Sequence, residues 1–222
     1  MHIPDGYLGP ATYGTLIGAT IPFWAFASWK LNRTLRARQA PYLALGAAFS
    51  FVIMMFNFPV LGGTTGHATG TTLIAILLGP WAAIIAVSVA LIIQALLFGD
   101  GGITAIGANC FNMAVAGGLT GYGVYRLLSA GSDRVEKRRL VAGAIAAYAG
   151  LNMSSLLTAV QLGLQPLLEL SPEGQPLYAP YPLAVTIPAM ALGHLTLFGF
   201  IEAGVTVLVL KYFQKNEPEM LG

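Results

Sequence analysis

Charged residues are scarce in this sequence, and their scarcity excludes an ordinary water-soluble protein. Only 9% of the 222 residues are charged, whereas 56% are hydrophobic. Soluble domains carry about 25% charged residues, because water must solvate their surface. Glycine and proline are abundant, at 27 and 13 residues, and both are tolerated in membrane helices. The composition therefore predicts a helical membrane protein.

The sequence also lacks the features that support several other classes of function. Its single cysteine, Cys110, excludes an intrachain disulfide and a cysteine-rich metal cage. No P-loop, GxSxG or HExxH motif is present, so no nucleotide-hydrolysing or common hydrolase site is indicated. The opening MHIPDGYLGP contains Asp5 and no lysine or arginine, unlike a secretory signal. We therefore expect the mature chain to start at Met1.

Long apolar runs alternate with three clusters of basic residues, around 30–38, 126–139 and 211–215. The positive-inside rule assigns all three clusters to the cytoplasm, so the chain must cross the membrane an even number of times between them. Three runs lie between the first two clusters, and one of them, 71–98, contains Gly79-Pro80. Because proline interrupts a helix, we divide that run there. One kinked helix with a false span elsewhere is the alternative.

The expected fold is all-α: a single transmembrane domain, 1–222, with seven transmembrane helices. A metal-binding arm, 1–6, precedes the first helix. The amino terminus is expected outside and the carboxyl terminus inside, in the cell membrane. The expected helices are 7–29, 41–60, 66–78, 81–98, 103–128, 140–164 and 184–212.

The first two residues can chelate a metal ion by themselves. The amine of Met1, the amide nitrogen of His2 and the imidazole of His2 offer three nitrogen donors, in fused five- and six-membered rings. His67, in the glycine-rich link between the second and third helices, is expected on the same side of the membrane and could supply a fourth. Four nitrogens in a plane suit Ni(II) or Cu(II), and Co(II) can use the same donors. Alternatively, both histidines have no ligand role.

Other polar residues lie inside the predicted spans. His194 and Glu202 are ionisable residues within the membrane, where such residues are expensive and often functional. A proton-coupled metal permease acting through Glu202 is therefore an alternative function, and a membrane enzyme using His67 and His194 is a third. The interpretation we favour for both His194 and Glu202 is structural: they bond to neighbouring helices, or Glu202 lies near the cytoplasmic end. Asn109 and Asn112 could line a cavity or bridge helices. The link 165–183 could be an external loop or a lid.

Two motifs closely resemble the nickel/cobalt substrate-binding subunits of the NikM/CbiM family. They are the opening Met1-His2-Ile3-Pro4-Asp5-Gly6-Tyr7-Leu8 and the loop 62–70, GGTTGHATG. The resemblance implies that Met1, His2 and His67 bind Ni²⁺ or Co²⁺ as the transported substrate, in a planar set. The Pro4-Asp5 pair looks more like the nickel members.

The same resemblance implies partners rather than catalysis. Family members are S components of energy-coupling factor (ECF) importers, a kind of ABC importer. A transmembrane coupling (T) subunit and cytoplasmic ATPase subunits drive release, and a small accessory membrane subunit often joins. Apart from these chains and the membrane lipid, no partner is expected, and in particular no nucleic acid.

Overall fold

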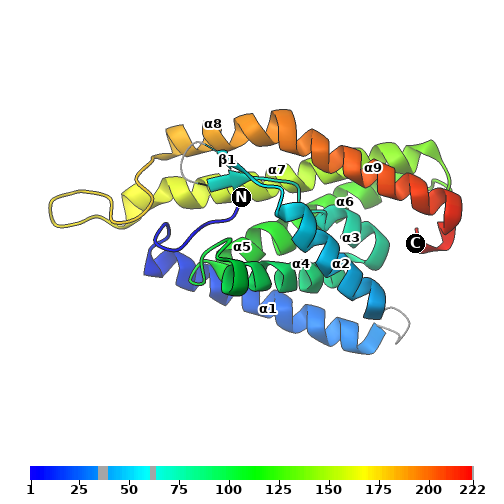
Figure 1. The fold of residues 1–222 in the computed structure, drawn as a ribbon, viewed down its shortest axis with the longest axis horizontal. Coiled ribbons are helices and arrows are strands. Elements are labelled where there is room, and N and C mark those ends of the chain that lie inside the picture. Colours follow the sequence, from blue (N-terminus) through cyan, green and yellow to red (C-terminus); the bar gives the residue numbers. More distant parts are fainter. Residues whose placement is uncertain (35–39, 61–63, 222) are drawn as a thin grey trace.

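The computed structural model describes residues 1–34, 40–60 and 64–221, which form an elongated bundle of helices (Figure 1). The α-helices are α1 (Pro10–Thr34), α2 (Ala40–Met54), α3 (Thr71–Leu78), α4 (Pro80–Ile93), α5 (Ile106–Asn109), α6 (Gly118–Ser129), α7 (Lys137–Leu168), α8 (Leu183–Gly193) and α9 (Gly199–Asn216). Three π-helical segments continue or join them: η2 (Gln94–Phe98) after α4, η3 (Cys110–Gly117) between α5 and α6, and η4 (His194–Phe198) between α8 and α9. A short 3₁₀ turn, η5 (Pro218–Met220), follows α9.

The break predicted at Gly79-Pro80 separates α3 from α4. Gly79 has φ +90°, a conformation that favours glycine, and its amide still donates to the Ala75 carbonyl at 3.0 Å. Pro80 begins α4, where a missing amide hydrogen costs nothing. The two helices thus fold back on each other over a single residue, as the proline position indicated.

Two expectations about helices are wrong. The predicted helix 41–60 ends at Met54, and a small antiparallel hairpin pairs β1 (Phe58–Val60) with β2 (Thr64–Gly66), so the chain is not entirely α-helical. Pro59 cannot continue a helix and is tolerated in so short a strand. The predicted helix 66–78 begins only at Thr71, after Gly70 at φ +69°. Residues Gly62 and Gly63 of the loop motif lie outside the described residues, as do Arg36 and Arg38 of the first basic cluster.

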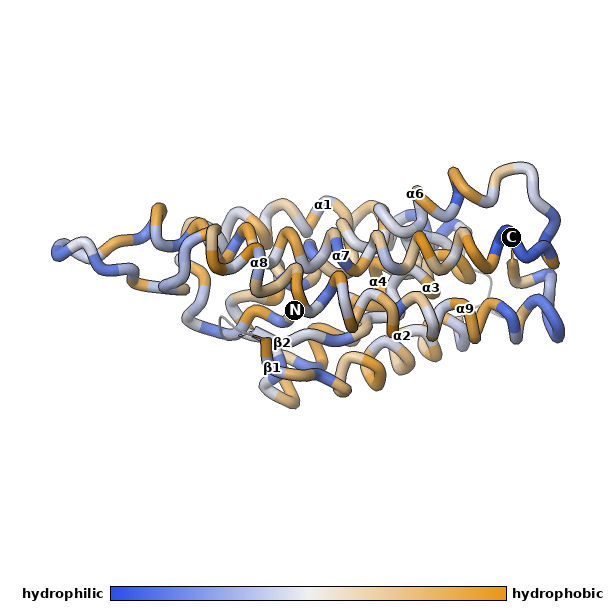
Figure 2. Tube along the Cα trace, turned by 90° about the horizontal axis from the view of Figure 1, so that it is seen from above, coloured by the Kyte–Doolittle hydropathy of each residue, from blue (hydrophilic) through white to orange (hydrophobic). Residues whose placement is uncertain are grey.

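Within the described ranges, three continuous helices are long and apolar enough to cross a membrane: Pro80–Phe98, Lys137–Leu168 and Leu183–Asn216. Apolar residues dominate the middle of the molecule, and hydrophilic residues concentrate toward its ends (Figure 2). The last turn of α1, the start of α7 and the end of α9 lie together at the end marked C in Figure 1, so basic residues from the three clusters gather there. Seven crossings with the amino terminus outside remain a prediction.

Candidate metal site

The amino-terminal arm lies inside the bundle rather than on its surface. Asn109 of α5 brackets Ile3: its Oδ1 accepts from the Ile3 amide at 2.9 Å, and its Nδ2 donates to the Ile3 carbonyl at 3.1 Å. The amide of Gly102 donates to the same carbonyl at 2.8 Å. The Thr64 hydroxyl donates to the His2 carbonyl at 2.9 Å. These bonds hold the arm, and none of them involves the amide nitrogen of His2.

Met1 anchors the arm through both its ends. Its side chain is fully buried in the main hydrophobic core, together with Met54, Ile74 and Phe198. Its amine contacts the Thr65 carbonyl and lies 3.2 Å from the Thr65 hydroxyl. A methionine at this position therefore fixes the amine by packing, beside the β2 strand that leads to His67.

His2 has its ring orientation set by Gln94. The Nε2 of His2 lies 3.2 Å from Oε1 of Gln94, while Nε2 of Gln94 donates to the Phe51 carbonyl at 3.3 Å. Because the Gln94 oxygen faces His2, the ring must carry its proton on Nε2. The Nδ1 atom then keeps its lone pair, is buried, and has no hydrogen-bond partner among the described residues. Nδ1 is the ring nitrogen that closes a six-membered chelate with the residue's own amide.

His67 shows the complementary arrangement. Its Nδ1 lies 3.0 Å from the Ala68 carbonyl, to which it must donate, so the lone pair is on Nε2. That Nε2 is buried and without a partner in the described part of the chain. The rings of His2 and His67 stack with centroids 4.6 Å apart and planes inclined by 27°. The fold therefore brings two imidazoles with free lone pairs and the terminal amine together.

Burial keeps these donors neutral. Desolvation lowers the pKa of the Met1 amine to about 4, although Asp100 opposes the shift. Desolvation, and then the nearby amino terminus, lower the pKa of His2 to about 3. The pKa of His67 falls well below its usual value, first by burial and then through the amino terminus and His2. Near pH 7 all three can donate a lone pair without first losing a proton.

Glu202 of α9 holds the loop that carries His67. Its carboxylate accepts from the Thr69 amide at 2.7 Å and from the Gly70 amide at 2.9 Å, and the Thr69 hydroxyl lies 3.3 Å away. These amides stand at the start of α3, where the helix has unpaired N–H groups and the positive end of its dipole. Glu202 is itself 2% exposed. The carboxyl group of Glu202 thus fixes the loop two residues beyond His67.

Glycines allow this loop to pack closely. A Cβ at Gly66 would overlap the ring of Phe198, and a Cβ at Gly70 would overlap the ring of Phe49. Gly70 also requires its positive φ. The glycines flanking His67 therefore serve both the turn and the close contact of the backbone with α2 and η4.

The remaining polar residues have mixed roles. His194 is fully buried, donates from Nδ1 to the Met190 carbonyl at 2.7 Å, and lies near enough to His67 to affect its titration. Asn112 bridges helices through Thr158 and Gln161, at 3.2 and 2.8 Å. The link after α7 starts at Glu169, later than predicted, because the helix continues to Leu168.

Asp5 does not point to the donors. It accepts from the amides of Ile103 and Thr104 at 3.0 and 2.9 Å. The Thr104 hydroxyl bond is the main reason that the pKa of Asp5 lies below its usual value. Asp5 therefore fixes the turn before α5.

No group of three or more histidine, cysteine, aspartate or glutamate side chains with metal-binding geometry occurs in the ranges 1–34, 40–60 and 64–221. The arrangement instead relies on main-chain nitrogens with two imidazoles, which a side-chain pattern does not reveal. Sequence reasoning missed Gln94 and Asp100, because neither belongs to a recognisable motif. The only available signal was that Gln94 is a polar residue inside an apolar run.

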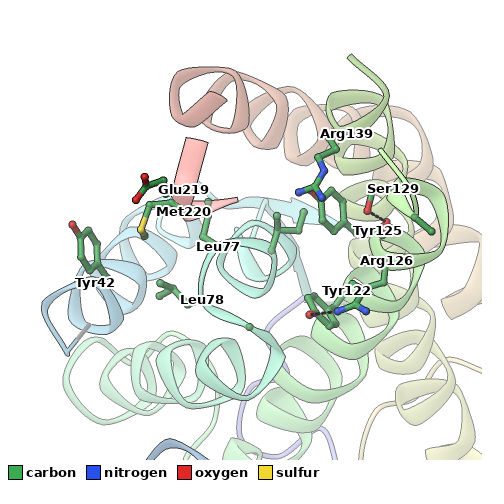
Figure 3. A pocket seen from close by; sticks show the side chains of 14 residues that line it. Tyr42, Leu77, Leu78, Tyr122, Tyr125, Arg126, Ser129, Arg139, Glu219 and Met220 are labelled. Atoms are coloured by element: carbon green, nitrogen blue, oxygen red, sulfur yellow. Dashed lines mark hydrogen bonds between the residues drawn. The ribbon is translucent and has the colours of Figure 1, made fainter. Parts of the chain in front are cut away.

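A cavity lies elsewhere in the molecule, toward the basic end of the bundle (Figure 3). Its volume is about 780 Å³. Tyr42, Tyr122, Tyr125, Arg126 and Glu219 are among the residues that line it. It contains no histidine among its lining residues and is separate from the donor nitrogens.

Comparisons with known proteins agree with a transport role. The family model described as "Cobalt uptake substrate-specific transmembrane region" matches residues 2–220. The fused nickel transport protein NikMN of Rhodobacter capsulatus is 54% identical over 221 residues, covering 100% of this chain and 64% of the relative. The "Probable fused nickel transport protein LarMN" of Lactiplantibacillus plantarum is 48% identical over 223 residues, covering 100% and 66%. This chain thus spans less than two thirds of either relative's length.

A solved structure is similar over nearly the whole chain. The crystal structure of a truncated transition metal transporter superposes with a TM-score of 0.93 at 50% sequence identity. The match covers 97% of this chain and 99% of that one. The similarity therefore extends over nearly the whole helical bundle.

Proposed function

Because this chain belongs to the family of cobalt uptake substrate-specific transmembrane regions, we propose that it is the substrate-binding subunit of a nickel importer, with cobalt as a second substrate. It is a multi-pass protein of the prokaryotic cell membrane. The two fused relatives described above are both named nickel transport proteins, which favours nickel over cobalt. The family resemblance seen in the opening and loop motifs is confirmed.

One observation carries the proposal. The Met1 amine acts electrostatically on His2 and His67, whose buried rings stack, and Nδ1 of His2 and Nε2 of His67 have no hydrogen-bond partner among the described residues. Buried nitrogens without a hydrogen-bond partner are uncommon, because burial without one is costly. A metal ion would satisfy these nitrogens at once. Gln94 and the Ala68 carbonyl bond to the other nitrogen of each ring and so fix the tautomers that a metal ion would need.

The proposed site is square planar. The Met1 amine and the His2 amide close a five-membered ring on the ion, and the His2 amide and Nδ1 close a six-membered ring. Nε2 of His67 supplies the fourth nitrogen. Four nitrogens in a plane are the geometry that Ni(II) prefers. The amide must lose its proton when it binds, so affinity rises with pH.

Release into the cell would require partners. We propose the T subunit and cytoplasmic ATPase subunits of an ECF importer, since this sequence contains no nucleotide-binding motif. The word "fused" in the names of both relatives supports an accessory membrane unit as a further partner. The proposed orientation has seven crossings, with the donor nitrogens at the outer face and the basic clusters inside.

The proton-coupled permease is less well supported. Its proton carrier would be Glu202, whose oxygens accept hydrogen bonds from Thr69 and Gly70. A carrier must exchange protons with water, whereas this carboxylate is buried and committed to the backbone of a loop. The enzyme alternative needs a catalytic acid or nucleophile beside His67 and His194, and the similar proteins are transporters.

The test is the metal content and visible spectrum of protein purified with an untagged amino terminus. We expect close to one nickel per chain and the diamagnetic spectrum of a square-planar ion. Adding one residue before Met1 should abolish binding, because it displaces the amine from the chelate, whereas a carboxyl-terminal tag should not. Nickel that persists in the extended protein would contradict the proposed site and direct attention to His194 and Glu202.

A further inference from the structure

Asp100 lies beside the donor nitrogens without belonging to any motif. Its Oδ1 is 3.4 Å from Nδ1 of His2, and its Oδ2 accepts from Nδ2 of Asn57 at 3.2 Å. The carboxylate is held in a turn between η2 and α5 in which Gly99 and Gly101 have positive φ. A Cβ at Gly101 would come within 3.3 Å of the His2 ring. This turn is therefore shaped to bring Asp100 against His2.

With the His2 proton on Nε2, no ring proton lies between Nδ1 of His2 and the Asp100 carboxylate. Gln94 requires the His2 proton on Nε2, so Nδ1 presents a lone pair to the Asp100 carboxylate. Two electron-rich atoms at this distance are favourable only with a cation near both. The Asp100 side chain is 17% exposed, whereas His2 is 3% exposed. Asp100 thus stands between water and the buried nitrogens.

The net charge of the proposed site also indicates an anion nearby. A divalent ion bound to one deprotonated amide and three neutral nitrogens retains one net positive charge. Such a charge in a buried place is costly unless an anion lies close. Two other carboxylates near the arm and loop are committed elsewhere, Asp5 to Ile103 and Thr104, and Glu202 to the start of α3. Asp100 acts electrostatically on the Met1 amine.

We propose that Asp100 is the outer-sphere carboxylate of the metal site: it receives the hydrated divalent cation at the solvent boundary and neutralises the charge of the bound complex. This inference rests on the proposed function. Asp100 is a positioning and charge-compensating residue, not a fifth ligand. Its removal should slow capture and weaken binding, but leave the coordination of the ion unchanged.

The experiment measures Ni²⁺ association by stopped-flow and affinity by titration, on full-length protein with an untagged amino terminus. Asp100→Ala removes the charge without offering a new hydrogen-bond donor to His2, and Asp100→Glu keeps the charge. Glu173→Gln is the matched control, because Glu173 is an exposed carboxylate in the loop after α7. Circular dichroism and gel filtration verify that each variant folds.

We expect Asp100→Ala to associate about tenfold more slowly, as for loss of a steering charge, and to bind at least about tenfold more weakly. Its rate should depend less on salt than that of the wild type. Asp100→Glu should recover much of the rate, and Glu173→Gln should match the wild type. The spectrum of bound nickel should be the same in all four proteins.

Three outcomes overturn the inference. Wild-type rate and affinity in Asp100→Ala would show that the charge is not used. A changed nickel spectrum in Asp100→Ala would make Asp100 a direct ligand. Both results would leave the proposed function intact, because the wild type still binds nickel. If the wild type binds no nickel at all, the proposed function fails together with this inference.

Discussion

The two ends of the bundle hold two different kinds of interior. At the basic end is a cavity of about 780 Å³, lined by tyrosines, Arg126 and Glu219. At the other end the donor nitrogens are packed tightly, with His2 and His67 stacked and almost inaccessible to water. Pocket size usually indicates where a drug-sized ligand binds. A bare ion needs lone pairs in a fixed geometry instead, so the buried donor nitrogens are the better candidate.

The difference also extends to how polar groups are satisfied. Arg126 at the cavity stacks over Tyr122 and is exposed, so its contacts are those of a surface residue. At the histidine end, by contrast, side chains from distant helices fix each ring. Buried polar networks of this kind rigidify a site when every member is satisfied, and the unsatisfied atoms mark where a ligand belongs.

The largest expected effect on nickel affinity comes from comparing His67→Ala at the histidine end with Arg126→Ala at the cavity. His67→Ala removes a donor nitrogen, and nickel affinity should fall by more than about 100-fold, beyond the usual cost of a second-shell change. Arg126→Ala, at the cavity, should leave affinity within a factor of about two. Isothermal titration with nickel measures both. A loss in Arg126→Ala as large as that in His67→Ala would move the site to the cavity.

A smaller effect is expected for Glu202→Gln. The amide oxygen of glutamine can replace one acceptor, but its NH₂ group would face the Thr69 or Gly70 amide. Each buried amide left unpaired costs about 1–3 kcal/mol, and the His67 loop should shift. We expect affinity to fall about 10- to 100-fold, with a broadened nickel absorption band. Glu219→Gln, exposed at the cavity, is the control.

The same variant distinguishes the permease alternative. A proton carrier would lose uptake in Glu202→Gln while retaining nickel affinity and an unchanged spectrum. Equal affinity in Glu202→Gln and the wild type would therefore contradict the role in holding the loop and favour the permease.

A more modest effect should follow from Gln94→Leu. Leucine fills a similar volume but cannot accept the Nε2 proton of His2, so the ring loses the partner that fixes its tautomer. Affinity should decrease about tenfold. Gln214→Leu, which removes bonds to the Arg134 and Glu136 carbonyls at the basic end, should have no effect on nickel. If the Gln94 and Gln214 variants bind nickel equally, the tautomer argument is wrong.

The last comparison concerns the protons released on binding. Because burial lowers the pKa values of the Met1 amine and His2 to about 4 and about 3, both are already neutral near pH 7. Only the amide then loses a proton, so affinity should change about tenfold per pH unit between about pH 6 and 8. Competition from the amine and imidazoles should begin only as the pH falls toward those lowered pKa values.

Calorimetry in buffers of different ionisation enthalpy counts the protons released. We expect one proton per nickel for the protein and close to two for a synthetic peptide of residues 1–8, whose exposed amine has an ordinary pKa of about 8. Two protons released by the folded protein would show that its amine is not held in the neutral state.

Local sequence determined the class of this protein and the chemistry it offers. A low charge content suits a protein that is solvated by lipid, and the Gly79-Pro80 pair favours a break between two helices. The membrane class and the α3–α4 break therefore follow from the residues alone. A histidine at position two can chelate because its donors are neighbours in the chain. The same local reasoning failed at 58–60, where apolar residues predicted the end of a helix and strand β1 formed instead.

Only the tertiary structure decided how those donors are held. Gln94 meets His2 across 92 residues, and Glu202 meets the His67 loop across 133. No periodicity records such pairs, because they depend on which helices pack together and at what depth. Burial, and with it the neutral amine, the fixed tautomers and the place of Asp100, arises from that packing. The sequence supplies nitrogen donors, and the folded bundle buries them and stacks the two imidazole rings.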